Sequence, residues 1–280
     1  MKILAIGEII FDVFDGEAEI GGAPLNFCAH CASLGADASI ISAVGNDSLG
    51  WVALENLRKF GVNTEYVQNN NLPTGQCIVT LRNGTPEYNV LRPVAYDKID
   101  IISNNYNADV FAFGTLIQRD SVSRNTLINV LKNGIFKEIF CDINLRKDCY
   151  DKESCLLCLE TSTILKISEE EEPLLHKYGL YTCGKTEKET LKSICKSFDN
   201  IKLILFTKGE NGSVVYSKIE NRFYEISAEK TNVVSTVGAG DSYSAAFVCE
   251  YMKSGDIIAA ANAGAKLSSF VVSHREAVPK

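Results

Sequence analysis

The segment Thr236-Val237-Gly238-Ala239-Gly240-Asp241 is followed at once by Ser242–Met252, which is rich in alanine and predicted to be helical. Its glycine turn would lie at a helix N-terminus, where free N–H groups and the helix dipole favour an anion. Small residues let the anion come close. Gly238, Ala239 and Gly240 could then hold a transferring phosphoryl group while Asp241 accepts a hydroxyl proton. A plain glycine turn, with Asp241 starting a helix, is the alternative on these residues alone.

Outward from this segment, short β-rich runs alternate with longer amphipathic stretches. This alternation predicts an α/β fold with a mostly parallel sheet covered on both faces. The expected strands are 2–6, 38–43, 109–113, 135–143, 164–167 and 203–206. The expected helices are 24–34, 49–60, about 120–132, 151–160, 186–198, 240–253 and 256–272.

One region breaks the alternation with two candidate β-hairpins. Residues 76–82 and 87–92 are strand-like and flank Asn83-Gly84, a strong hairpin signal. Residues 11–14 and 18–20 could form a second hairpin around Asp15-Gly16. A β-rich flap from about 11–20 and 75–92 would suit a lid over an active site. A structural extension or a dimer contact is the alternative.

Composition limits the class of protein. The 280 residues, 46% of them hydrophobic, fit one large domain over 1–280. The net charge of −7, from 28 basic and 35 acidic residues, argues against nucleic-acid and membrane-surface partners. No apolar stretch reaches the roughly 20 residues that a membrane span needs. Ten cysteines are too dilute for a disulfide scaffold, so we expect a cytoplasmic protein with mostly reduced thiols.

A second cluster lies in the N-terminal half. Gly21-Gly22-Ala23-Pro24-Leu25-Asn26 opens the first long helix, with Pro24 in the favoured first turn. Asn26 has donors and acceptors that suit a polyol, and the carboxylate of Asp12 could accept two sugar hydroxyls. Taken singly, these are helix-start and turn residues.

Together the two clusters resemble the ribokinase-like, or phosphofructokinase-B, carbohydrate kinases. The resemblance runs in order through nearly the whole chain. It rests on Gly7-Glu8 followed by Asp12, on 21–26, 34–36 and 44–50, on Asp142-Ile143-Asn144-Leu145-Arg146, on 207–212 and on 236–241. It implies a three-layer αβα sandwich with a small β-rich lid. Within the family, the sequences of residues 21–26 and 142–146 are most similar to those of fructokinases.

The resemblance also implies site residues and an activity. The enzyme would phosphorylate the primary 6-hydroxyl of fructose with ATP by in-line transfer, with Asp241 as the base. Mg²⁺ would bridge the phosphates, with Glu171 as a partner through water. The sugar would be held by Asp12, Gly22, Asn26, Arg92, Asn144 and Arg146. ATP would be held by Thr207, Gly209, Gly212, Gly238 and Gly240.

Three positions depart from the family pattern. Ser235 stands where an aspartate is usual, Glu276 where a glycine is frequent, and Ser168 where an asparagine is usual. The first two affect the site of a monovalent cation, so we expect weak or absent K⁺ activation; a replacement carboxylate from Glu276 is the alternative. Two rival functions stay open: a kinase for ribose, 2-keto-3-deoxygluconate, tagatose or a nucleoside, or a sugar or nucleotide sensor without turnover. A homodimer through the lid is a further expectation.

Other motifs are interpreted as structural. Gly179–Thr186 has the P-loop spelling, but the acidic stretch before it reads as a helix and not as the strand that a P-loop follows. We expect an interhelical turn there, with Thr186 near a helix start. The Cys-x-x-Cys pairs at Cys28 and Cys155 fall in helical patterns without knuckle glycines, so buried thiols are favoured over zinc. The histidines, including His176, are read as structural or surface residues.

Overall fold

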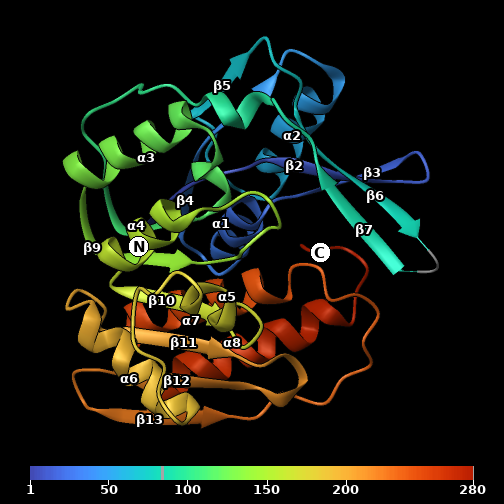
Figure 1. Cartoon of the computed structure of the whole chain (residues 1–280). Coiled ribbons are helices and arrows are strands. Elements are labelled where there is room, and N and C mark those ends of the chain that lie inside the picture. Colours follow the sequence, from blue (N-terminus) through green and yellow to red (C-terminus); the bar gives the residue numbers. More distant parts are fainter. Residues whose placement is uncertain (83–84, 280) are drawn as a thin grey trace.

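The computed structural model describes residues 1–82 and 85–279. Its central sheet runs across the molecule (Figure 1). The strands of this sheet are β1 (Lys2–Ile6), β4 (Asp37–Gly45), β5 (Val67–Asn70), β8 (Asn107–Gly114), β9 (Ile135–Asp142), β10 (Ile164–Ser168), β11 (Leu203–Thr207), β12 (Ser213–Ser217) and β13 (Arg222–Ile226). They lie in the order β13-β12-β11-β10-β9-β8-β1-β4-β5. Pairing is parallel from β5 to β11 and antiparallel at β12 and β13.

Helices cover both faces of this sheet. One face carries α1 (Ala23–Ser33), α2 (Ser48–Lys59), α7 (Ala239–Ser254) and α8 (Ile257–Val272). The other carries α3 (Ser121–Asn133), α4 (Lys152–Thr161), α5 (Glu172–His176) and α6 (Glu187–Ser197). Single 3₁₀ turns form η1 (Ala95–Lys98), η2 (Leu116–Arg119) and η3 (Gly209–Asn211).

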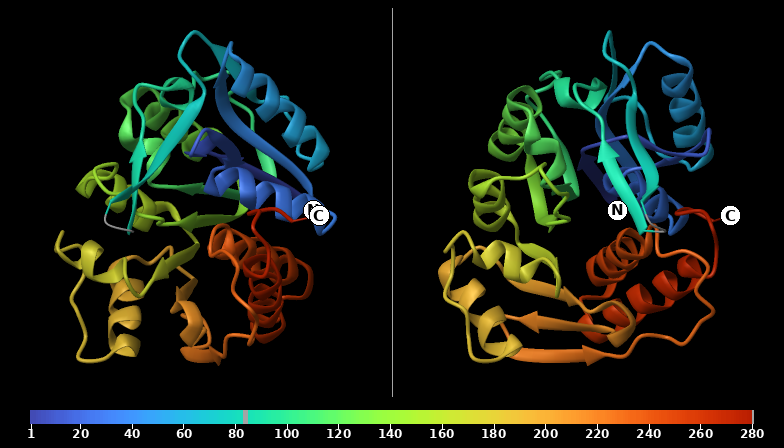
Figure 2. Two further views of the ribbon diagram at one scale, coloured as in Figure 1. Left: turned by 90° about the vertical axis from the view of Figure 1, so that its right-hand side faces the viewer. Right: turned by 45° about the vertical axis from the view of Figure 1, so that its right-hand side comes forward.

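The alternation of side chains along each strand divides the core between the two faces. In β1, Ile3 and Ala5 pack with the layer of α1 and α7, whereas Leu4 and Ile6 pack with the opposite layer. A parallel strand buried on both sides is a nearly continuous apolar run, as β1 is from Ile3 to Ile6. The result is the predicted three-layer αβα fold with a mostly parallel sheet, seen from two further sides in Figure 2.

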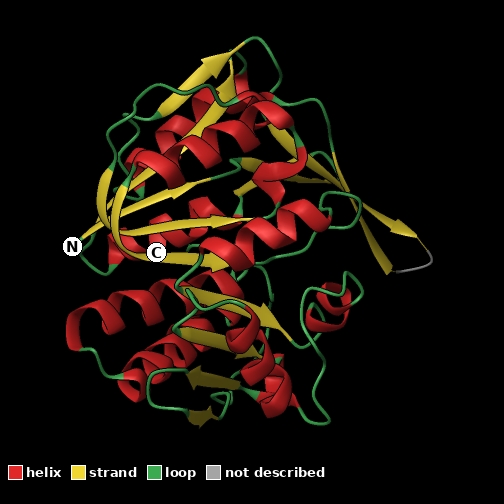
Figure 3. Ribbon diagram, turned by 60° about the vertical axis from the view of Figure 1, so that its left-hand side comes forward, coloured by secondary structure: helices red, strands yellow, loops and turns green. Residues whose placement is uncertain are grey.

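A second, four-stranded sheet projects from one side of the molecule (Figures 1 and 3). It contains β2 (Ile10–Phe14), β3 (Glu17–Gly21), β6 (Gly75–Arg82) and β7 (Thr85–Val90), in the order β3-β2-β6-β7. Both predicted hairpins pair as antiparallel strands. In the first, Asp15 and Gly16 have φ values of 51° and 81°, as its tight turn requires. The second turn, Asn83-Gly84, lies outside the described residues.

Every expected strand and helix is present, with ends shifted by one or two residues. Three strands were not predicted. β5 and β13 have polar or charged positions. In β12 the apolar run is only the three residues from Val214 to Tyr216, between two serines, which is too short a pattern to separate from a loop. Together β12 and β13 extend the sheet beside α8.

The P-loop-like segment and the Cys-x-x-Cys pairs lie in the kinds of element predicted for them. The P-loop-like segment Gly179–Thr186 follows α5 rather than a strand, and the Thr186 side chain caps α6 by accepting from the Glu189 amide. The two Cys-x-x-Cys pairs lie in α1 and α4 with all four thiols buried and free. Over 1–82 and 85–279, no helix combines the length and the apolar character needed to cross a membrane.

Candidate functional site

The turn before α7 has the backbone geometry of an anion site. Gly238 adopts φ 78°, and a Cβ there would lie 2.8 Å from the Ala277 carbonyl oxygen, so only glycine fits. The N–H groups of Gly240 and Asp241 lie in the first turn, where no intrahelical acceptor exists. The Ala239 N–H, also expected to bind the anion, makes a long 3.3 Å bond to the Thr236 carbonyl. The N-terminus of α7 therefore presents the predicted amides, with Ala239 partly engaged.

Asp241 and Asn26 meet although 215 residues separate them. The Asn26 Nδ2 donates to Asp241 Oδ2 at 2.8 Å, which joins α1 to α7. Burial raises the pKa of Asp241, and the Asn26 bond and the charges of Lys166 and Arg146 offset part of that rise. A carboxylate with a raised pKa is better matched to accepting a proton near neutrality. Among the described residues, the buried Asn26 Oδ1 has no hydrogen-bond partner and so can accept from a ligand.

The start of α1 is fixed by Gly22 and Glu8. Gly22 has φ 114°, and a Cβ there would lie 2.5 Å from the Glu8 carbonyl oxygen. The Ala23 N–H donates to Glu8 Oε1 at 3.1 Å. Burial raises the pKa of Glu8 to about 7, with opposing contributions from backbone bonds and Arg146. The sequence motif predicted no role for Glu8. In the structure its side chain lines the pocket.

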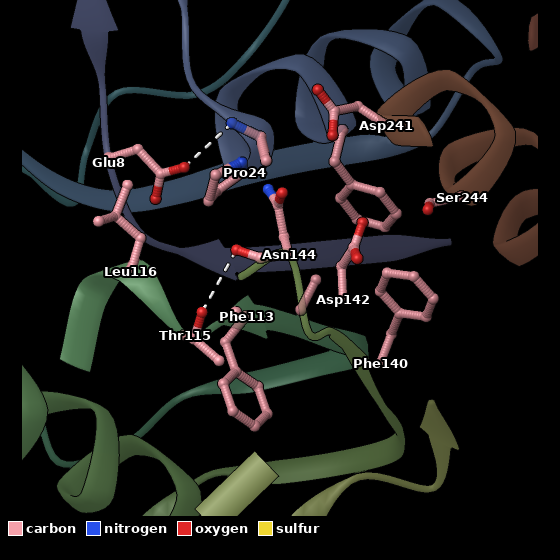
Figure 4. A pocket seen from close by; sticks show the side chains of 14 residues that line it. Glu8, Pro24, Phe113, Thr115, Leu116, Phe140, Asp142, Asn144, Asp241 and Ser244 are labelled. Carbon is pink, nitrogen blue, oxygen red and sulfur yellow. Dashed lines mark hydrogen bonds between the residues drawn. The ribbon is translucent and has the colours of Figure 1, made fainter. Parts of the chain in front are cut away.

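A pocket opens between the N-termini of α1 and α7 and the ends of β8 and β9 (Figure 4). Its volume is about 30 Å³, which holds a water or two, so a larger ligand would have to extend beyond it. Asp142 Oδ1 is buried there without a partner among the residues described. The lining residues are Glu8, Ala23, Pro24, Phe27, Ala112, Phe113, Gly114, Thr115, Leu116, Phe140, Asp142, Asn144, Asp241 and Ser244.

Lys166 and Asp142 form a buried ion pair that the sequence analysis did not single out. Lys166 Nζ lies 2.7 Å from Asp142 Oδ2, and a Cβ placed on Gly240 would lie 3.1 Å from that nitrogen. The ammonium group thus lies next to the first turn of α7. Burial would lower the pKa of Lys166, but Asp142, Glu171 and Asp241 raise it overall, so the side chain stays charged. A lysine inside the apolar run Ile164–Ser168 was the signal that could have revealed it.

The predicted sugar residues differ in their placement. Asp12 is half-buried in β2, and the charge of Arg146 offsets part of the rise in its pKa that burial causes. Arg146 also lowers the pKa of Glu8 and Asp241, so it lies near all three carboxylates. Asn144 lines the pocket with φ 40°. Arg92 is exposed and donates to the Asp148 carbonyl at 2.8 Å, away from the pocket lining.

The predicted nucleotide loop follows β11, the neighbour of β10. Thr207 pairs in register with Ser168, and Gly209 and Gly212 have φ values of 53° and 85°. A Cβ on Gly212 would lie 2.1 Å from the Ile226 carbonyl oxygen, so glycine is also needed for packing. The loop is also in contact with α7, because the hydroxyl of Ser213, which follows Gly212, lies 2.8 Å from the Tyr243 hydroxyl.

Glu171, the predicted magnesium partner, lies at the same edge of the sheet. Its Oε1 accepts from the Leu145 N–H at 2.8 Å and its Oε2 from the Ser168 N–H at 2.9 Å. Its charge raises the pKa of Asp142 and Lys166. Each oxygen keeps a second lone pair for a water, so the arrangement fits a magnesium ion held through water.

Comparison with known proteins agrees with this geometry. The profile of the pfkB family of carbohydrate kinases matches residues 4–279. PH1459 of Pyrococcus horikoshii, described as an uncharacterized sugar kinase, is 29% identical over 90% of this chain and 83% of its own length. Its structure with ATP has a TM-score of 0.81, 25% identity, and coverage of 99% of this chain and 94% of that one. The ribokinase of Dictyostelium discoideum is 26% identical over 88% of this chain and 80% of its own.

A third similar protein is the fructokinase of Vibrio cholerae O395, solved with fructose, ADP and calcium. It has a TM-score of 0.85 and 19% identity, with coverage of 99% of this chain and 94% of that one. This structural similarity shows the fold, which is that of the ribokinase-like kinases. The family match over nearly the whole chain bears on the activity: the chain belongs to the pfkB family of carbohydrate kinases and is an ATP-dependent sugar kinase.

Proposed function

We propose that this sugar kinase is a fructokinase that transfers the γ-phosphoryl group of ATP to the 6-hydroxyl of fructose. The observation that carries the proposal is the bond between Asn26 and Asp241, because it joins the sugar-side helix to the helix that holds the anion site. The segment Asp142–Arg146, which resembles fructokinases, supplies Asn144 to the pocket. A fructokinase is also among the similar structures.

The proposed mechanism follows from the positions of the charges. Asp241 removes the proton from the sugar hydroxyl as the oxygen attacks in line. The amides of the first turn of α7 and the ammonium group of Lys166 stabilise the negative charge on the transferring group. Asn26, Gly22, Asp12, Asn144 and Arg146 hold the sugar at the mouth of the pocket. Arg92 would reach the sugar only if it left the Asp148 carbonyl.

ATP would lie along the ends of β10 and β11, with Thr207, Gly209 and Gly212 on the nucleotide side and Gly238 and Gly240 at the γ-phosphate. Mg²⁺ fits this site because it keeps most of its waters and needs few protein oxygens. Glu171 would hold one of those waters. The ion would neutralise phosphate charge during transfer.

The four-stranded sheet is proposed to act as a lid over the sugar. Asp12 in β2 links the lid to the site, since the charge of Arg146 acts on both Asp12 and Asp241. Closure would exclude water, which otherwise competes as the acceptor. A homodimer through this sheet stays a prediction, supported by the 45% exposure of Phe14 at the end of β2.

The acceptor can be identified by measuring ADP release with fructose, ribose, 2-keto-3-deoxygluconate, tagatose and a nucleoside. We expect the highest kcat/KM with fructose. A rate with another acceptor and none with fructose would replace the substrate and keep the kinase. Binding of sugar and ATP without any turnover would favour a sensor.

The role of Asp241 is tested by Asp241→Asn, which keeps the side-chain size and an oxygen that can accept from Asn26. Turnover should fall by roughly 100-fold or more because the base is lost, while calorimetry should show sugar binding largely intact. Asp148→Asn, on the exposed loop next to the site, is a matched control that should keep turnover. Comparable kcat values for the Asp241→Asn variant and the wild type would remove Asp241 as the base.

A further inference from the structure

A group of metal-binding side chains lies outside the kinase site, at the segment with P-loop spelling. Glu172 and His176 lie four residues apart on α5, so they share one helix face. Cys183, in the loop before α6, completes the group, and one ligand atom from each residue lies within 4.8 Å of the others. None of the three belongs to the proposed sugar, ATP or magnesium residues.

The surroundings of these residues favour metal binding. His176 Nδ1 is shielded from water and has no hydrogen-bond partner among the described residues, a costly state that a metal bond would relieve. The Tyr181 hydroxyl donates to Glu172 Oε1 at 2.9 Å, which orients the carboxylate. The Thr190 hydroxyl lies 3.6 Å from Cys183 Sγ and is held in place by the Gly184 N–H and the Thr186 carbonyl. Such outer contacts are typical of metal ligands.

We propose that Glu172, His176 and Cys183 form a zinc site that braces the loop between α5 and α6. Oxygen, nitrogen and sulfur together form a donor set that zinc accepts, with a water as fourth ligand. Zinc bonds of about 2.0–2.3 Å place ligand atoms within about 4 Å of one another, so small side-chain rotations complete the site. Cys183 is exposed, which gives the ion a route in.

There is a physical reason for a metal ion to stabilise α5 and the loop that follows it. α5 has five residues, too few to be stable by itself, and the following loop contains Gly179 at φ 65°. A metal bond from the loop back to α5 would restrict both. The inference is independent of the sugar that the kinase uses.

The experiment uses the full chain, stripped of metal by a chelator and titrated with Zn²⁺ against a chromophoric competitor. We expect one tight site per chain and a rise in melting temperature on adding zinc. Cys183→Ser and His176→Gln should each weaken binding by roughly 100-fold or more, and Tyr181→Phe by about 10-fold. Kinase turnover of Cys183→Ser and His176→Gln should stay near wild type.

Cobalt(II) gives a second readout, because a thiolate bound to it produces a charge-transfer band in the near ultraviolet. The band should appear in the wild type and in Cys249→Ser, a matched thiol control, and be lost in Cys183→Ser. Melting curves without metal check that each variant is folded. Zinc affinity and cobalt spectra that are unchanged in Cys183→Ser and His176→Gln, or no tight binding to the wild type, would overturn the proposal.

Discussion

The buried ion pair of Lys166 and Asp142 calls for a functional explanation. A buried pair contributes little net stability, because the cost of removing both charges from water offsets their attraction. Its side chains are 8% and 13% exposed, and it lies under the first turn of α7. A fixed positive charge at this position would stabilise the phosphoryl group during transfer.

Lys166→Met keeps the length of the side chain and removes its charge. We expect kcat to fall by roughly 100-fold, the usual effect of losing one fixed stabilising group at such a site. The measurement is steady-state ADP release with saturating ATP and sugar. The double variant Lys166→Met/Asp142→Asn removes the unpaired carboxylate as well and should regain stability but not activity. A single variant with nearly normal kcat would show that the pair is only structural.

The raised pKa of Glu8 predicts that the free energy of unfolding depends on pH. Its pKa is about 7 in the folded chain, against an ordinary value of 4.5. Between these values the folded state keeps the proton and the unfolded state releases it, so rising pH favours unfolding. The full difference corresponds to about 3 kcal/mol.

Glu8→Gln should remove this loss while still accepting the Ala23 N–H. Urea unfolding from about pH 5 to about pH 8 should show the variant gaining about 2–3 kcal/mol relative to the wild type as pH rises. Glu17→Gln, on the exposed hairpin, serves as control and should show no such trend. A constant difference between Glu8→Gln and the wild type would mean that Glu8 is already ionised in the folded state.

Among the elements, two loops beside α7 bear on the response to monovalent cations. Ser235 Oγ accepts from the Val237 N–H at 3.2 Å, where the family usually has an aspartate. Glu276 is exposed. The His30 Nε2 lies 2.9 Å from the Ala277 carbonyl oxygen, so that oxygen already has a partner. One carboxylate is missing and one carbonyl is engaged, which weakens a cation site.

We therefore expect nearly equal rates in Na⁺, K⁺ and choline buffers at equal ionic strength. Ser235→Asp restores the usual carboxylate and should introduce stimulation by K⁺. His30→Gln should not do so, because it leaves Ser235 in place. Strong K⁺ stimulation of the wild type would contradict the expectation.

The helices, the edge strand β13 and the hairpins show which elements can be predicted from the sequence and which cannot. α1, α2, α7 and α8 were predicted because their turn residues, such as Gly35 after α1 and Gly61 after α2, end clear helical patterns. β13 was missed because it lies at the sheet edge, where exposed charged residues interrupt the pattern. The two hairpins were predicted from Asp15-Gly16 and Asn83-Gly84, because such pairs favour tight turns.

On the scale of the whole molecule, the site combines segments that are distant in sequence. Four of its residues come from α1, β9, β10 and α7, namely Asn26, Asp142, Lys166 and Asp241, and Glu8 comes from the loop between β1 and β2. Only the order of the strands brings them together. Lys166 was missed because a sequence pattern does not show which charged residue faces an anion site across the sheet. The net charge of −7 is compatible with ATP binding, because helix amides, Lys166 and Arg146 set the local field.

The four-stranded sheet is connected to the Gly238 turn through the C-terminal loop. Arg275 binds Glu17 and Glu19 on the β2–β3 hairpin, with both distances 3.1 Å. Two residues later, Ala277 packs against the Gly238 turn. A ligand that orders the turn could therefore act on the lid through this loop.

Hydrogen exchange of the Asp241→Asn variant tests lid closure without turnover. With sugar and ATP together, amides of β2, β3 and β6 should exchange at least about 10-fold more slowly than in the free protein, and more slowly than with either ligand alone. Arg275→Ala should raise lid exchange in the free protein and leave the melting temperature nearly unchanged, since an exposed ion pair contributes about 0–1 kcal/mol. Unchanged lid exchange at saturation by both ligands would mean that the four-stranded sheet is a fixed extension rather than a lid.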